Sequence, residues 1–165
     1  MFKPVIGNTP LACLPHDHSR CVAEALAEAE VLCARQGTRL TALRKRVLEL
    51  VWASHKPLGA YDILGVLSDE DGRRAAPPTV YRALDFLLEN GLVHRIASLN
   101  AFIGCIHPGE LHQGQFLICR TCHTAIELEQ DSISQAIVDG AAQVGFAVES
   151  QTVEVVGLCS GCQAS

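Results

Sequence analysis

Two pairs of cysteines with the spacing Cys-x-x-Cys are the residues of this chain whose chemistry is most specific. Cys119 and Cys122 form the first pair, and Cys159 and Cys162 form the second. Each pair can direct two sulfur atoms at one ion, so together they supply the four thiolates of a closed tetrahedral zinc site. Two disulfides, or four unrelated buried cysteines, are the alternative interpretations. A four-cysteine cage has no open coordination position, so this zinc is expected to stabilise the fold rather than to catalyse a reaction.

A second group of potential metal ligands lies between residues 94 and 127. It comprises two imidazoles, one thiol and one carboxylate: His94, Cys105, His112 and Glu127. Zinc accepts such a tetrahedral set, and the thiolate favours zinc over ferrous iron or manganese, which prefer nitrogen and oxygen ligands. Taken singly, each residue is also explained as a surface histidine, a buried apolar cysteine or a solvated carboxylate. Their shared place where two domains are expected to meet favours a joint zinc site.

Other potential ligands remain open. His107 could replace His112, because Cys105 and His107 are also spaced for chelation. A separate cluster falls in a loose N-terminal arm, a place that disfavours a metal site: His16, Asp17, His18 and Cys21. The sequence assigns no role to Cys13, Cys21 or Cys33 beyond that of structural or solvent-exposed thiols.

Composition predicts a soluble protein of the cytoplasm. The chain has 165 residues, of which 48% are hydrophobic and 19% are charged. No apolar run approaches the ~20 residues of a membrane span, and the N-terminus lacks the pattern of a signal peptide. Eight cysteines without an export signal predict a reducing compartment, where thiols bind metal rather than pair. We therefore expect a cytoplasmic protein with no membrane partner.

The charge is unevenly distributed along the chain. The net charge is −5 overall, but residues 35–95 carry +3 and residues 96–165 carry −6. The basic excess is greatest in residues 35–56, where Glu49 is the one acidic residue among six basic ones: Arg35, Arg39, Arg44, Lys45, Arg46 and Lys56. A basic patch in an acidic protein is what local contact with nucleic-acid phosphates requires, although a solvated helix face gives the same pattern.

Hydrophobic periodicity predicts a winged helix-turn-helix domain over residues 19–105, after the loose arm at residues 1–18. Apolar residues recur at helical spacing in four segments: 19–35, 41–56, 60–67 and 77–90. Thr41 is the expected N-cap of the second helix, and Pro77-Pro78 opens the fourth. Residues 69–76 are expected to be a polar loop. After Gly91, two short strands at 92–97 and 101–105 form a hairpin, which completes the order of elements in a winged helix.

A smaller unit is expected at residues 115–165, after a hinge at residues 106–114. Its pattern is strand, strand, helix and strand over four segments: 115–119, 124–128, 132–144 and 146–156. Four apolar residues of the helix are expected to face inward: Ile133, Ile137, Ala141 and Val144. So small a unit needs help for its stability, which zinc and a paired subunit would supply. The predicted fold class is α+β, with an N-terminal winged helix-turn-helix DNA-binding domain and a C-terminal dimerization domain stapled by zinc.

The fourth helix carries polar side chains opposite its apolar stripe. Thr79, Tyr81 and Arg82 lie in its first turns, where a recognition helix meets base edges. Arg82 can donate two hydrogen bonds to guanine, and Tyr81 can lie against a thymine methyl group. The preceding helices offer side chains suited to phosphate or groove contact: Arg44, Lys45 and Tyr61. Ordinary exposed residues would look the same singly, so the DNA-binding prediction depends on their combination with the basic segment and the order of elements.

Over residues 19–162 these motifs resemble those of the ferric uptake regulator superfamily of bacterial metal-dependent repressors. The strongest matches are Arg39-Leu-Thr41, Ala60-Tyr-Asp62, the run Pro-Thr-Val-Tyr-Arg-Ala-Leu-Asp-Phe-Leu at 78–87, Gly91-Leu-Val-His94 and the two cysteine pairs. Within the superfamily the chain most resembles the zinc uptake regulators. The His-His-Asp-His run that is typical of the iron sensors is missing between Cys105 and Cys119. This departure argues against an iron sensor.

The resemblance implies a role for each group of residues. Structural zinc falls on Cys119, Cys122, Cys159 and Cys162, and sensing zinc on His94, Cys105, His112 and Glu127, which makes two zinc ions per subunit. Tyr61, Tyr81 and Arg82 match DNA-contacting positions. The implied protein is a homodimeric transcriptional repressor that binds palindromic operator DNA when its sensing site is filled and represses zinc uptake genes.

Two kinds of alternative remain. One is a redox-switched regulator, or a nickel or manganese sensor, of the same superfamily. The other is a zinc enzyme, which is disfavoured because the cysteine pairs complete a cage without water and no His-x-Glu precedes a Pro-Cys-x-x-Cys. Neither catalysis nor a small-molecule substrate is therefore expected.

Overall fold

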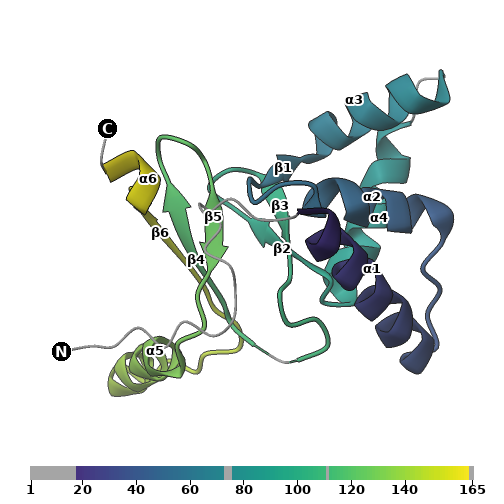
Figure 1. The fold of residues 1–165 in the computed structure, drawn as a ribbon. Coiled ribbons are helices and arrows are strands. Elements are labelled where there is room, and N and C mark those ends of the chain that lie inside the picture. The colour runs from purple at the N-terminus through teal and green to yellow at the C-terminus, as the bar shows by residue number, and fades with distance from the viewer. Residues whose placement is uncertain (1–17, 73–75, 111, 164–165) are drawn as a thin grey trace.

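The computed structural model describes residues 18–72, 76–110 and 112–163. Residues 1–17, which hold most of the expected arm and two of the four residues of its candidate cluster, His16 and Asp17, lie outside the described residues. Two units stand next to each other in Figure 1: four helices with a small sheet, and a second sheet with two further helices. None of the helices in the described ranges combines the length and the apolarity that crossing a membrane needs.

The first unit contains helices α1 (His18–Arg35), α2 (Ala42–Trp52), α3 (Ala60–Asp71) and α4 (Pro77–Glu89). Thr41 caps α2 as predicted, because its hydroxyl accepts a hydrogen bond from the Arg44 amide at 3.4 Å. Helix α3 continues to Asp71 and ends where Gly72 adopts a φ of 60°, a conformation that glycine reaches without steric cost. The polar loop expected from residue 69 is therefore wrong over residues 69–71, which are helical.

Helix α4 begins at the two prolines, as predicted. Pro77 and Pro78 occupy positions where an N–H group would have no partner within the helix. The Thr79 amide then donates to the Ala76 carbonyl at 2.9 Å. The apolar face of α4 is buried against the other helices through Val80, Ala83, Leu84, Phe86 and Leu87.

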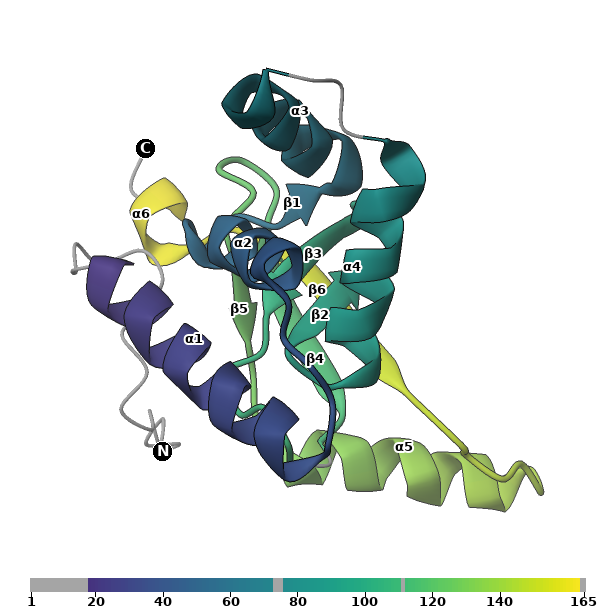
Figure 2. The same cartoon turned by 90° about the vertical axis from the view of Figure 1, so that its right-hand side faces the viewer.

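A three-stranded antiparallel sheet completes the first unit. Its strands are β1 (Leu58–Gly59), β2 (Val93–Ile96) and β3 (Ala101–Gly104), in the order β1-β3-β2. The pair β2 and β3 is the predicted hairpin, whereas the two-residue strand β1 was not predicted. One hydrophobic core joins helices α1–α4 to this sheet, which confirms the winged helix-turn-helix (Figure 2).

The second unit has the predicted order strand, strand, helix, strand. Its elements are β4 (Gly114–Cys119), β5 (Ala125–Glu127), α5 (Asp131–Gln143), β6 (Thr152–Gly157) and the short helix α6 (Ser160–Gln163). The strands lie in the order β5-β4-β6, with β5 antiparallel and β6 parallel to β4. Together the two units confirm the α+β fold class.

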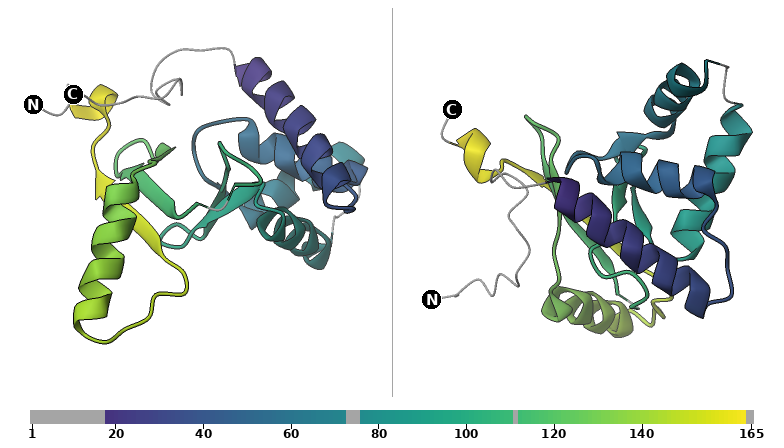
Figure 3. Two further views of the ribbon diagram at one scale, coloured as in Figure 1. Left: turned by 90° about the horizontal axis from the view of Figure 1, so that it is seen from below. Right: turned by 45° about the vertical axis from the view of Figure 1, so that its right-hand side comes forward.

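Two expectations for the second unit are wrong. The last strand begins at Thr152 rather than at residue 146. The apolar residues of α5 do not face a core of the same chain, since Ile137 and Val144 are exposed and Ile133 and Ala141 are half-buried. Figure 3 shows why: α5 lies on the side of the second sheet away from helices α1–α4. Periodicity identified the apolar face but not what covers it.

A small apolar cluster joins the two units. Ile96 and Ile103 of the hairpin pack there against Phe116, Ile118 and Ala125 of the second sheet. The Ala125 amide also donates to the His55 carbonyl at 3.1 Å. The hairpin is therefore a shared element that belongs to the first sheet and lies against the second.

Gly104 at the end of β3 is where the backbone comes closest to Trp52. A Cβ atom there would lie 2.2 Å from the nearest ring atom of Trp52. We expect Gly104→Ala to lower the free energy of unfolding by about 1–3 kcal/mol, the usual cost of overpacking, in denaturant titrations followed by circular dichroism. Gly65→Ala is the control, because space is open around that position in α3 and alanine should add about 0.5–1 kcal/mol. Wild-type stability of Gly104→Ala would contradict the close approach.

Candidate metal centres and nucleic-acid face

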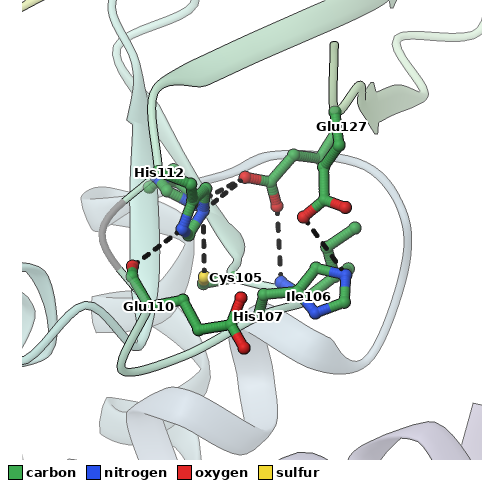
Figure 4. Close-up of polar contacts among 8 residues, drawn as sticks. Cys105, Ile106, His107, Glu110, His112 and Glu127 are labelled. Atoms are coloured by element: carbon green, nitrogen blue, oxygen red, sulfur yellow. Dashed lines mark hydrogen bonds and ion pairs between the residues drawn. The ribbon is translucent and has the colours of Figure 1, made fainter. Parts of the chain in front are cut away.

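The structure brings His94, Cys105, His112 and Glu127 together at the junction of the two units; we call this cluster the mixed site. One ligand atom from each residue lies within 4.8 Å of all the others. The two histidine Nε2 atoms are 3.1 Å apart, and each is 2.9 Å from Oε1 of Glu127. The Cys105 Sγ lies 3.5 Å from Nε2 of His112. Figure 4 shows Cys105, His112 and Glu127 converging on one another.

These separations fit a four-coordinate zinc ion. Zinc bonds of ~2.0–2.3 Å to nitrogen, oxygen and sulfur place neighbouring tetrahedral donors about 3.3–3.7 Å apart. The observed separations of 2.9, 3.1 and 3.5 Å are the same or slightly shorter. Small outward movements of the side chains would therefore admit the ion.

The ligands of the mixed site come from both units. His94 lies on β2, and Cys105 directly follows β3. His112 lies in the connector before β4, and Glu127 is the last residue of β5. The Cys105 residue is 2% exposed and the Glu127 side chain 3%. The complete ligand set therefore exists only while the hairpin and the second sheet are in contact.

Backbone groups orient two of the ligands. His112 Nδ1 lies 2.9 Å from the Glu110 carbonyl oxygen; since a carbonyl only accepts, Nδ1 carries the proton and Nε2 presents its lone pair. The Ile106 amide donates to Oε2 of Glu127 at 3.3 Å, which leaves Oε1 facing the histidines. Both contacts are visible in Figure 4.

Burial governs the electrostatics of the mixed site. Burial, together with the charge of the nearby Glu127 carboxylate, raises the pKa of the Cys105 thiol to about 12. Burial also opposes ionisation of Glu127, but the hydrogen bond and charge of His94 and the Ile106 amide outweigh it, so the pKa of Glu127 lies below its ordinary value. The site thus holds an ionised carboxylate and a thiol that ionises readily only beside a cation.

His107, the open alternative to His112, lies outside the mixed site. Its Nε2 atom is 3.2 Å from Oε1 of Glu129, and its side chain is 43% exposed. Glu129 is not among the ligand candidates of the described residues. The geometry therefore favours His112 over His107 as the fourth donor.

The four cysteines form a second cluster, the cysteine cage, within the second unit. Their Sγ atoms all lie within 4.8 Å of one another. Cys119 ends β4, and Cys162 lies in α6, the helix that follows Cys159. The 3.7 Å between Sγ of Cys122 and Sγ of Cys159 matches the ~3.8 Å expected for two sulfurs bonded to one tetrahedral zinc ion. The turn of the first pair closes with His123 at a φ of 60° and its amide donating to the Cys119 carbonyl.

The cysteine cage already favours negative charge. Backbone hydrogen bonds from Cys122 and Cys159 lower the pKa of Cys119 to about 6, and hydrogen bonding to Thr124 lowers that of Cys122. Hydrogen bonding to Cys159 raises the pKa of Cys162 to about 12, since neighbouring thiolates resist a further one. Such a cluster fits a cation that neutralises all four sulfurs.

The predicted nucleic-acid face is exposed on α3 and α4. Tyr61 is 73% and Tyr81 41% exposed, and Thr79 and Arg82 are exposed. A cleft of about 210 Å³ separates the starts of α2 and α4, and six residues line it: Thr41, Leu43, Arg44, Thr79, Arg82 and Ala83. The Arg44 guanidinium lies 3.6 Å above the Phe86 ring and donates to the Arg39 carbonyl at 2.6 Å. Stacking holds this charge at the cleft in a fixed orientation.

The basic residues of α2 have different partners. Lys45 donates to Glu30 of α1 at 2.5 Å, and Arg46 pairs with Glu49 at 2.8 Å and with Glu70 of α3. The pairs with Glu30 and Glu70 tie α2 to α1 and α3. Lys45 is therefore paired with a carboxylate, whereas Arg44 is stacked on Phe86 at the cleft.

The sequence and the fold are both similar to those of known proteins. The model of the Ferric uptake regulator family matches residues 35–156. The chain is 39% identical over 140 residues to the zinc uptake regulation protein of Escherichia coli (strain K12), covering 84% of this chain and 81% of that protein. A zinc uptake regulator solved in complex with zinc and DNA superposes with a TM-score of 0.81 at 38% identity, covering 87% of this chain and 95% of the other.

The chain is also similar to two crystal structures of one relative, XcZur, in its holo and apo forms. The holo form superposes with a TM-score of 0.78 at 41% identity, covering 90% of this chain and 100% of the other. The apo form gives 0.50 at 42% identity, covering 86% and 97%. Identity and coverage are nearly the same, so the chain superposes better on the holo form than on the apo form.

Zinc affinity at the mixed site should rise with pH. Cys105, with a pKa of about 12, is protonated at neutral pH and must lose its proton to bind zinc. Binding therefore releases a proton, and the affinity should rise about tenfold per unit over roughly pH 7–9. Competition with a chelator of known pH dependence measures it. Cys105→Ser should bind more weakly and with a smaller slope; a flat wild-type profile would contradict the protonated thiol.

Proposed function

The chain belongs to the Ferric uptake regulator family, and we propose that the mixed site makes it a zinc-responsive member of that family. It is a homodimeric transcriptional repressor that binds operator DNA, and not an enzyme. The observation that carries the proposal is the origin of the ligands: hairpin and second sheet both contribute to one buried cluster. A site of this kind responds to zinc with a change of arrangement.

The coupling follows from where the ligands lie. If the hairpin moves away from the second sheet, His94 and Cys105 leave Glu127, so the separated arrangement has no complete set. Zinc, when bound, supplies the positive charge that joins the four donors. It therefore favours the closed arrangement by the difference between its affinities for the two arrangements, and about 5.5 kcal/mol moves the population from 1:99 to 99:1. DNA that binds the closed arrangement must tighten zinc binding equally.

The XcZur pair supports this reading of the closed arrangement. The chain superposes better on the holo form of that relative than on its apo form, as expected if metal binding favours the closed arrangement. The DNA-bound zinc uptake regulator also shares the present arrangement. We take the structure to have the domain arrangement of the DNA-competent subunit.

Dimerization sets the geometry of DNA binding. Large apolar side chains are exposed on α5, on β6 and between them: Ile137, Val138, Val144, Phe146, Val155 and Val156. A second subunit would cover this surface. Two recognition helices α4 held one duplex turn apart, roughly 34 Å, meet both half-sites of a palindrome together. In this proposal Arg82 and Tyr81 contact bases, while Arg44, Thr79 and Tyr61 contact the backbone or groove.

The finer assignments are also part of the proposal. Each subunit holds two zinc ions, a structural one in the cysteine cage and a regulatory one in the mixed site. Residues 19–105 form the DNA-binding domain, 106–114 the hinge and 115–165 the dimerization domain. The protein acts in the cytoplasm and represses genes of zinc uptake.

Cys105→Ser should separate the two zinc ions. The variant loses the thiolate of the mixed site but keeps the cysteine cage, so it should stay folded with one zinc per subunit and bind the operator poorly at every buffered zinc level. Wild type should hold two ions, fall to one after mild chelation, and lose operator binding with the second ion. Cys21→Ser, which changes a half-buried thiol of α1, is the control. Normal zinc-dependent binding by Cys105→Ser would refute the assignment.

Arginine variants should distinguish base contact from phosphate contact. Arg82→Ala should cost about 1–3 kcal/mol of operator binding and relax the preference at one base pair. Arg44→Gln should weaken binding to all sequences and reduce the slope of log affinity against log salt by about 1. Lys45→Gln is the control, because Lys45 is paired with Glu30 and its loss should change the slope little. Fluorescence anisotropy over a salt series measures all three.

A further inference from the structure

One row of the second sheet presents three side chains to the hairpin. Phe116 on β4 is paired with Glu127 on β5 and with Glu154 on β6. Directly paired residues on neighbouring strands project from the same face of a sheet. The row therefore carries the Phe116 ring with one carboxylate on each side of it, Glu127 on β5 and Glu154 on β6. All three lie on the face of the sheet that packs against the first unit.

Two members of the row already contribute to the junction of the two units. Glu127 belongs to the mixed site, and its Oε2 accepts from the Ile106 amide just after the hairpin. Phe116 is 1% exposed, packs with Ile96 and Ile103, and lies edge-on to the His94 ring with the centroids 5.3 Å apart. Glu154 belongs to neither ligand cluster of the described residues, so its role needs a separate explanation.

Glu154 binds the turn of the hairpin. Its Oε1 accepts from the Ala97 amide at 2.6 Å and its Oε2 from the Ser98 amide at 3.1 Å. Both carboxylate oxygens are thus used on consecutive amides, and hydrogen bonds to an ionised group are the stronger kind. Burial opposes ionisation of Glu154, but the bonds from Ser98 and Ala97 outweigh it and keep the pKa of the carboxyl below its ordinary value.

The turn that Glu154 binds is itself well ordered. The Asn100 amide donates to the Ala97 carbonyl at 3.2 Å, and Arg95 Nη2 donates to Asn100 Oδ1 at 2.9 Å. Asn100 has a φ of 48°, which asparagine tolerates better than most residues. Hydrogen bonds to Ala97 and Ser98 therefore orient the whole hairpin and not the turn alone.

We propose that Glu154 is a positioning residue for operator binding: a second clasp, made without metal, that fixes the angle of the hairpin on the dimerization unit. The inference rests on the proposed function, because the angle matters only if zinc-dependent closure aligns α4 with DNA. The mixed site holds the hairpin at its open end, and Ile96 and Ile103 pack beside it in the apolar cluster, which carries no directional bond. Glu154 holds the turn at the other end and limits rotation of the hairpin about these contacts.

The dimensions make the second clasp effective. Glu127 and Glu154 lie on the two strands that flank β4, so their strands are about 10 Å apart. The hairpin moves with α4, because Leu92 and Val93 share one buried core with Leu84 and Leu87. The Leu92 amide also donates to the Leu87 carbonyl at 2.8 Å. A rotation of the hairpin would thus displace the recognition helix.

The test compares Glu154→Ala and Glu154→Gln with Glu149→Gln in the full-length dimer. Glu149 is an exposed carboxylate before β6, so its substitution changes the net charge as Glu154→Gln does. With zinc saturating, Glu154→Ala should bind the operator at least about tenfold more weakly than wild type. Glu154→Gln, which keeps one acceptor oxygen, should lie between, and Glu149→Gln should match wild type.

Measurements on the zinc-free protein distinguish a role of Glu154 in positioning the hairpin from a general effect on the stability of the fold. The zinc-free Glu154 variants should bind the operator as weakly as zinc-free wild type, retain the zinc of the cysteine cage and unfold at the same denaturant concentration. Zinc binding to the mixed site, measured on the DNA-bound protein, should weaken by the same factor as operator binding. Glu154→Gln preserves side-chain volume and serves as the test if Glu154→Ala does not fold.

Two results would overturn the proposal. One is zinc-saturated operator binding by both Glu154 variants that equals that of Glu149→Gln. The other is an equal loss with and without zinc, which would make Glu154 a general stability residue. Failure of the proposed function is distinguishable, because wild type itself would then bind the operator equally with and without zinc.

Discussion

Buried acidic groups at the junction of two units are the constraint on which this structure depends. Glu127 and Cys105 are almost fully removed from water, and an ionised carboxylate in such a place is costly unless positive charge or hydrogen bonds offset the lost hydration. His94 and the Ile106 amide offset part of that cost. A divalent cation offsets more and lets the Cys105 thiol ionise. The free energy of the joint therefore depends on whether the site is filled.

The two ligand clusters differ in what they hold together. The cysteine cage lies wholly within the second unit, so a zinc ion there stabilises that unit whatever the position of the first. The mixed site spans both units, so a zinc ion there stabilises their contact. The ligand atoms differ along the same division: the cysteine cage offers four sulfurs, whereas the mixed site offers one sulfur, two imidazoles and one carboxylate. Four thiolates suit permanent retention, and one reluctant thiolate with three weaker donors suits exchange.

Local patterns in the sequence predicted most of the elements and both ligand sets. Thr41, Pro77-Pro78 and the Cys-x-x-Cys pairs act through their own backbone or their near neighbours, so they can be recognised without the fold. Contacts set by strand register could not be predicted in this way. Glu154 reads as a polar residue in an alternating strand, and nothing nearby in the sequence indicates the turn at Ala97 and Ser98. For the same reason β1 was not predicted, because this strand exists through its pairing with β3. The sequence also left open whether His112 or His107 is the fourth ligand, because the path of a short connector decides it.

The exposed apolar surface of α5 and β6 explains why a clasp within one subunit controls binding by two. A single subunit leaves Val144 80% and Phe146 65% exposed, and such a patch is stable in water chiefly when another molecule covers it. Once a second copy covers it, the dimerization units form one rigid base, and each α4 is carried by its own joint. A palindrome is met by both helices only if both joints hold the same angle. If the angle at the junction differs in one subunit, its recognition helix no longer meets its half-site. Closure of one subunit alone therefore adds little operator affinity, and the symmetry of the dimer sharpens the response of DNA binding to zinc.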